Sequence, residues 1–167
     1  MLADAGTKPV RFWLRPVLVV VIILAQSTGA GMGAWGHGIL ENDGGADWIC
    51  DMAERQVASV IDRALRSVSN DAGYVDVDEA SEALAAADFV AAAAGHAASD
   101  YAKEFENLAK SDPKFAAPER IMAALGAVDR VLADSELNDL WKETEDYGKW
   151  RAVVEDLRSR LFATTGE

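Results

Sequence analysis

The spacing of apolar residues is the feature of this 167-residue chain that most limits its fold. From Ala46 onward, apolar side chains recur at intervals of three and four residues, and runs of β-branched residues are few. This periodicity is typical of amphipathic helices. We therefore predict an all-α fold, a compact bundle of five to six helices preceded by an N-terminal loop rich in glycine and tryptophan.

Capping residues and helix breakers predict where the individual helices begin and end. The first helix should begin near Gly44, with Asp43 as its N-cap acceptor, and should continue to about Val68. The second helix is rich in alanine, and we expect it at the centre of the bundle because it is apolar on most of its surface. This second helix is expected over residues 79–94, closed by Gly95. The later helices are expected over 99–110 (broken by Pro113), from Pro118, from Ser135, and after a bend at Gly148.

Residues 1–30 contain the three parts of an export signal in the usual order. Basic residues come first, an uninterrupted apolar run follows at residues 17–25, and small side chains end the segment. We predict cleavage after Ala30, with Ser27 as a second possible cleavage site. The basic residues are Lys8, Arg11 and Arg15.

Two other interpretations of this leader stay open. A membrane-spanning helix needs roughly 20 apolar residues, and the run here is about half as long, so a permanent anchor is the less favoured interpretation. If Met32 is the true start, the protein is cytoplasmic. We predict an exported protein, periplasmic or secreted, in which residues 31–167 form a single all-α domain released without a lipid anchor.

The charge of the chain restricts its partners. The formal net charge is −12, and removing a leader with three basic residues and one acid leaves −14 for residues 31–167. Such a charge repels nucleic acid and anionic lipid, and it favours solubility or a basic protein partner. We therefore expect no nucleic-acid contact and no membrane contact after the leader is removed. The lone Cys50 cannot form an internal disulfide, so stability must come from a packed core.

Glycines, tryptophans and carboxylates are concentrated at residues 33–48, which we call the N-terminal motif. Asp43, Asp47 and Asp51 are four residues apart and would line one side of the first helix. Hard cations favour grouped carboxylate oxygens, so a metal or ligand site is one interpretation. The candidate binding residues are Trp35, His37, Glu41, Asn42, Asp43, Asp47 and Trp48.

A structural interpretation of the same motif is simpler. Asp43 and Asp47 would stabilise the start of a helix through its cap and its dipole. The glycines would allow tight turns that place Trp35 against the bundle, with its indole N–H bonded to a buried carbonyl. His37 could act as a general base, but no nucleophile is linked to it. We therefore predict no catalytic residue, no cofactor and no complete set of metal ligands.

Trp141 and Trp150 could form an aromatic platform for a ligand. Each tryptophan nevertheless falls in phase with the apolar positions of its own helix, which favours packing in the core.

The residues described above carry a family resemblance. The GAWG sequence at residues 33–36 with Gly38, the END sequence at 41–43 and the DW pair at 47–48 resemble an uncharacterised bacterial family, domain of unknown function number 4259. The alanine-rich helix, Ser135-Glu136-Leu137 with Trp141, and the closing Trp150-Arg151 helix resemble its later landmarks. The resemblance implies no particular activity. It also leaves the localisation open, because the family that the chain resembles has both exported members and members that begin at a methionine just before the motif.

Three functional hypotheses remain. The first is a non-enzymatic protein-binding module, exported and acidic, with a basic protein as its partner. The second is a metal-binding protein or metal-assisted hydrolase that uses Glu41, Asp43, Asp47 and His37. The third, which applies if Met32 is the start, is a cytoplasmic protein that resembles immunity proteins. We favour the first because the chain is strongly acidic and lacks a recognisable catalytic motif.

Overall fold

The computed structural model describes residues 36–54, 56–70, 73–101 and 103–166. Trp35 and the leader lie outside the described residues, as do the side chains of Cys50 and Asp51. The elements of the described part are α2 (Asp43–Glu54), α3 (Val57–Asn70), α4 (Val77–Ala93), α5 (Lys103–Ala109), the 3-10 helix η1 (Pro113–Ala116), α6 (Pro118–Ala133), α7 (Glu136–Lys142), α8 (Tyr147–Ala163) and the 3-10 helix η2 (Thr164–Gly166).

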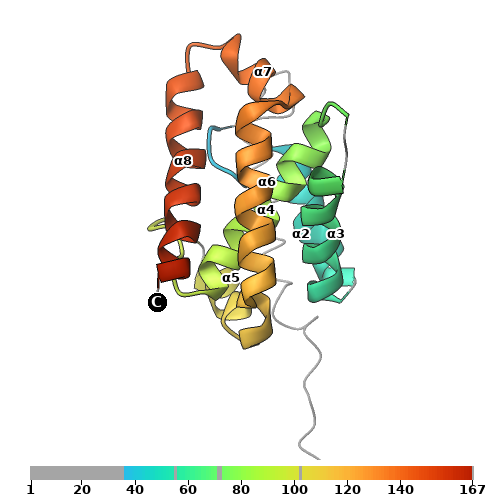
Figure 1. The fold of residues 1–167 in the computed structure, drawn as a ribbon, viewed down its shortest axis with the longest axis vertical. Coiled ribbons are helices and arrows are strands. Elements are labelled where there is room, and N and C mark those ends of the chain that lie inside the picture. The colour runs from blue at the N-terminus through green and yellow to red at the C-terminus, as the bar shows by residue number, and fades with distance from the viewer. Residues whose placement is uncertain (1–35, 55, 71–72, 102, 167) are drawn as a thin grey trace, which may run out of the picture.

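The alanine-rich helix α4 is the centre of the bundle (Figure 1). It contacts every other α-helix in the described part of the chain. Twelve of its residues are buried, among them a run of alanines that lets neighbouring helices approach closely. The all-α prediction and the central position of this helix are therefore confirmed.

The first predicted helix is two helices in the structure. Helix α2 ends at Glu54, and α3 begins at Val57 after a turn at Gln56, whose carbonyl accepts hydrogen bonds from the N–H groups of Ser59 and Val60. The apolar positions on both sides of this turn are buried, and both helices contact α4. A single straight helix that carried all of these apolar positions could bury only some of them against α4. The chain therefore reverses direction between α2 and α3. This split gives seven α-helices among the described residues instead of five or six.

Most other predicted boundaries agree with the structure. Helix α4 is capped by Asp76, whose side chain accepts a hydrogen bond from the Glu79 N–H, and Gly95 follows the helix with a φ of +93°. Ser135 caps α7, and Pro118 is in the first turn of α6. Helix α5 is shorter than predicted. The predicted bend at Gly148 is wrong, because the turn lies at residues 143–146 and Gly148 belongs to the first turn of α8.

One charged pair lies inside the bundle. Asp88 of α4 is 4% exposed, and its Oδ1 accepts a hydrogen bond of 2.8 Å from Arg160 of α8. Arg160 also donates to the carbonyl of His96 and to the carboxylate of Asp156. The pair thus connects α8 to α4 and to the segment that follows α4. This pair was not predicted from the sequence, although Asp88 is the one acid in the apolar stretch at residues 83–93.

Candidate functional site

The loop before α2 is closed by Glu41. Its backbone N–H donates to the Gly38 carbonyl at 3.1 Å, and its carbonyl accepts from the Gly36 N–H at 3.3 Å. The carboxylate Oε2 accepts a third bond, from the Gly38 N–H at 2.9 Å. A Cβ atom at Gly36 would collide with this carboxylate, and one at Gly38 would come within 2.8 Å of Oε2. Glu41 and the two glycines therefore form one compact turn.

Asn42 caps helix α2. Its Oδ1 accepts a hydrogen bond of 2.8 Å from the Gly45 N–H, and its Nδ2 donates to the Ile39 carbonyl at 2.9 Å. The prediction that Asp43 is the cap acceptor is therefore wrong. Asp43 is instead the first residue of the helix, with an exposed side chain. An N-cap side chain must bond an N–H two or three residues later, and Asn42 is the residue placed to do so.

Gly44 brings α2 close to α4. A Cβ atom at Gly44 would lie 2.7 Å from the Cβ of Ser81, a distance that real Cβ atoms essentially never show. Gly44 is therefore explained by close helix packing, whereas a Cβ atom at Gly45 would lie 3.1 Å from the Ile39 carbonyl oxygen.

Trp48 lies in the core. Its side chain is fully buried, and its ring contacts Phe89 and Phe105 edge-on, with centroid distances of 6.1 and 6.4 Å. Its indole Nε1 is buried and has no hydrogen-bond partner. Edge-to-face contacts of this kind add to the stability that burial provides. The structure thus places this motif residue in the packing of the bundle.

The remaining motif residues do not converge. Asp47 is exposed on α2, and His37 is exposed in the preceding loop. His37 lies within electrostatic range of Asp146 in the α7–α8 turn, where the pKa of Asp146 is lowered mainly by a hydrogen bond from Lys149 and slightly by His37. Among the described residues, no three His, Cys, Asp or Glu side chains are grouped closely enough to hold a metal ion.

The two tryptophans near the C-terminus stack on each other. The rings of Trp141 and Trp150 are 5.9 Å apart and nearly parallel, and Tyr147 stacks on Trp150 at 6.1 Å. Trp150 is 3% exposed, and Trp141 is half-buried against the core. The predicted packing role therefore describes Trp150 well, while Trp141 keeps part of its surface exposed.

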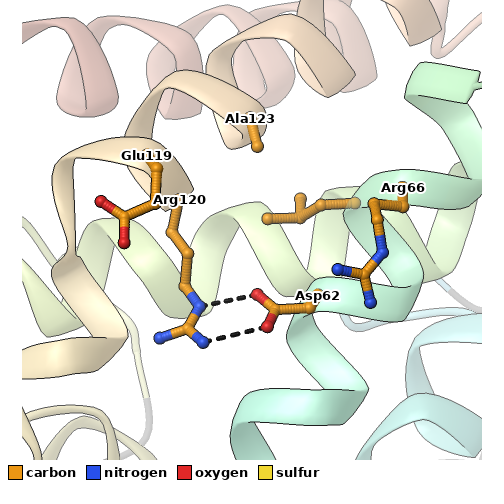
Figure 2. Close-up of a pocket in the computed structure, with 6 residues that line it drawn as sticks. Asp62, Arg66, Glu119, Arg120 and Ala123 are labelled. Atoms are coloured by element: carbon orange, nitrogen blue, oxygen red, sulfur yellow. Dashed lines mark hydrogen bonds and ion pairs between the residues drawn. The ribbon is translucent and has the colours of Figure 1, made fainter.

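A groove separates α3 from α6 (Figure 2). Its volume is about 260 Å³. Arg120 of α6 reaches across it to Asp62 of α3, with Nε to Oδ1 at 2.7 Å and Nη2 to Oδ2 at 3.0 Å. The hydrogen bonds from Arg120 lower the pKa of Asp62, against the effect of burial. The residues that line the groove are Asp62, Leu65, Arg66, Glu119, Arg120 and Ala123.

A second surface lies on the outer side of α6 and α8. Met122 and Phe162 are 63% and 64% exposed, more than any other large apolar side chains in the described part of the chain. Arg158 donates to Asp129, which fixes α8 beside α6. Met122 is two turns before Asp129, and Phe162 is one turn after Arg158. The start of α6 and the end of α8 lie at the same end of the bundle (Figure 1).

We call this surface the α6–α8 face. It consists of Met122, Gly126 and Asp129 of α6 with Arg158 and Phe162 of α8. This face was not predicted from the sequence, in which the signal for it is weak. Ile121 of α6 and Leu161 of α8 are buried residues of the apolar stripes of their helices. Met122 and Phe162 each come one residue later and therefore lie off those stripes.

These observations define a small all-α domain whose N-terminal motif builds a turn, a helix cap and part of the core. The chain belongs to the family described as a domain of unknown function, DUF4259, whose sequence profile matches residues 33–153. This match confirms the resemblance carried by the motif. No curated protein and no solved structure matches the chain significantly. None of the helices in the described ranges is both long enough and apolar enough to cross a membrane.

Proposed function

We propose that this protein is an exported, non-enzymatic module that binds another protein through the α6–α8 face. The observation that carries the proposal is the exposure of two large apolar side chains, Met122 and Phe162, at the same end of one helix pair. Exposed apolar groups gathered on a polar surface are typical of interaction sites.

The composition of this face suits a binding surface. Gly126 presents open backbone: apart from its chain neighbours and its own helix backbone, no atom lies within 4 Å of the position that a Cβ would take. Asp129 and Arg158 pair with each other beside the apolar residues. An apolar centre with charged residues at its edge is the usual arrangement in protein interfaces.

The polar groups of the N-terminal motif support a non-enzymatic role. Glu41 bonds to the Gly38 N–H, and Asn42 bonds to the Gly45 N–H and the Ile39 carbonyl. The side chains of Glu41 and Asn42 are therefore already hydrogen-bonded to backbone groups within the fold. The charge of −12 for the chain, or −14 after removal of residues 1–30, favours a basic partner, because opposite charges accelerate the encounter between two proteins.

Photo-cross-linking in the native host tests the proposal. Benzoylphenylalanine placed at Met122 or Phe162 should capture one protein of high isoelectric point in the exported fraction. Tyr74 is the matched control, because it is 52% exposed and lies before the start of α4, at the other end of the bundle. Capture from Tyr74 alone, or from none of the three positions, would contradict the proposal.

A further inference from the structure

Among the arginines whose side chains the structure describes, Arg66 is the one without a hydrogen-bond or ion-pair partner. Of the arginines whose side chains the structure describes, the others each take part in an ion pair, whereas Arg66 has neither a hydrogen bond nor an ion pair. This is unexpected in a chain with 28 acidic residues and 16 basic ones. An exposed guanidinium at the edge of a groove is available to an anionic group from outside.

The acid nearest to Arg66 along the groove is already used. Both oxygens of Asp62 accept hydrogen bonds from Arg120, so Arg66 contributes only a weak electrostatic effect on Asp62. Figure 2 shows Arg66 and Glu119 at opposite sides of the groove, with the Arg120–Asp62 pair between them. The groove therefore offers one available cation at its α3 side, above the apolar side chains of Leu65 and Ala123.

The size of the groove limits what can enter it. Sites for small molecules usually have volumes of about 300–1,000 Å³, and this groove has about 260 Å³. The groove is open to solvent, and its lining residue Ala123 directly follows Met122 in α6. A single side chain from a protein bound to the α6–α8 face would fit these limits better than a free ligand.

We propose that the partner of this protein inserts an acidic side chain into the groove between α3 and α6, where its carboxylate pairs with Arg66. This inference rests on the proposed binding function. The planar guanidinium of arginine matches the two oxygens of a carboxylate and can donate two parallel hydrogen bonds. The aliphatic part of a glutamate side chain would cover Leu65 and Ala123.

The local charge at Arg66 also explains how a basic partner could be selected. The acidic surface attracts many basic proteins at long range, so net charge alone gives little specificity. An acidic residue of the partner would be repelled by most of this acidic surface and attracted at Arg66. Specificity gained in this way comes from a local match together with repulsion elsewhere.

Nuclear magnetic resonance with small peptides tests the inference. The ¹⁵N-labelled protein is titrated with N-acetyl-alanyl-glutamyl-alanine amide, and the glutaminyl and lysyl peptides serve as matched probes. The glutamyl peptide alone should shift the backbone signals of Leu65, Arg66 and Ala123 and the Nε signal of Arg66, in a saturable manner. In Arg66→Gln, the affinity should fall about tenfold or more, as expected for the loss of a charge-assisted hydrogen bond.

Arg63→Gln is the control variant, because Arg63 is also an exposed arginine of α3 but pairs with Glu82 of α4 at 3.6 Å. This variant should bind the glutamyl peptide like the natural protein. Equal shifts with the glutamyl and glutaminyl peptides, or unchanged binding in Arg66→Gln, would overturn the inference. Either result, obtained while cross-linking at Met122 and Phe162 succeeds, leaves the proposed function standing. Failed cross-linking overturns the proposed function independently of the peptides.

Discussion

At the scale of single residues, the polar side chains of the N-terminal motif bond mainly to backbone groups. Asn42 satisfies one free N–H of α2 and the carbonyl of Ile39, and Glu41 satisfies the Gly38 N–H. Backbone groups at a helix start lack partners within the helix, so such side chains have a structural purpose that needs no ligand. The acids at 43 and 47 remain exposed on the same helix.

The buried pair of Asp88 and Arg160 gives a pH-dependent prediction. Burial raises the pKa of Asp88 above its ordinary value of 3.8, while Arg160 opposes the shift. The carboxyl group of Asp88 therefore stays protonated up to a higher pH in the folded protein than in the unfolded chain. The extra proton bound by the folded state contributes to stability. This contribution grows as the pH falls through the raised pKa of Asp88 and is complete below the ordinary value of 3.8.

The measurement is urea unfolding of the natural protein and of Asp88→Asn from neutral pH to below pH 3.8. Relative to Asp88→Asn, the free energy of unfolding of the natural protein should rise as the pH falls. Asp78→Asn, at an exposed position of the same helix, controls for the loss of one charge. A difference that falls with falling pH would show that Arg160 dominates and that the pKa of Asp88 is lowered.

Single residues were the hardest part to predict from the sequence. Asn42 and Asp43 are both good N-cap residues, and only the helix start, fixed when Gly44 packs on Ser81, decides between them. Arg66 looks like any other solvated arginine in the sequence. Its lack of a partner is a property of the folded surface, because Arg120, 54 positions further along, takes the carboxylate of Asp62.

At the scale of helices, periodicity predicted most of the fold. Gly95, Pro118 and Ser135 each act where a helix end or helix start was expected. The division between α2 and α3 could not be predicted in the same way. No glycine or proline lies near Gln56, and the apolar positions continue at helical spacing across the turn. The turn is required by packing, since both helices bury their apolar sides against α4.

Two glycines test the helix packing in opposite directions. Gly44→Ala should destabilise the protein by about 1–3 kcal/mol, because the new Cβ would overlap with Ser81 and force α2 away from α4. Gly126→Ala should stabilise it by about 0.5–1 kcal/mol, because alanine favours the helix and the added methyl group meets open space. Urea unfolding measures both changes. Equal effects of the two substitutions would mean that α2 does not contact α4 as closely as described.

At the scale of the whole molecule, the proposed export would determine which partners the protein can meet. We predict that the mature chain begins at Gly31, after cleavage behind Ala30. Mass spectrometry of the N-terminal peptide from the host's exported fraction checks this. A peptide that begins at Thr28 would support export with the second cleavage site. A chain found only in the cytoplasm and beginning at Met32 or Gly33 would contradict export.

The structural motif and the proposed binding face occupy different parts of the molecule. Residues 36–48 of the N-terminal motif attach the start of α2 to the bundle, whereas the α6–α8 face lies on the outer side of different helices. Substitutions in the two regions should therefore have different effects. The loss of an N-cap costs about 0.5–2 kcal/mol of stability, and an exposed surface substitution usually changes stability by less than about 0.5 kcal/mol.

The most direct test of this separation is calorimetric titration of the cross-linked partner, once identified, with Met122→Ser and Asn42→Ala, together with the melting temperature of each variant. We expect Met122→Ser to weaken binding about tenfold at an unchanged melting temperature, as for the loss of an apolar contact at an interface centre. Asn42→Ala should lower the melting temperature and bind normally while folded. A folded Asn42→Ala protein that fails to bind, beside a Met122→Ser protein that binds normally, would contradict the account.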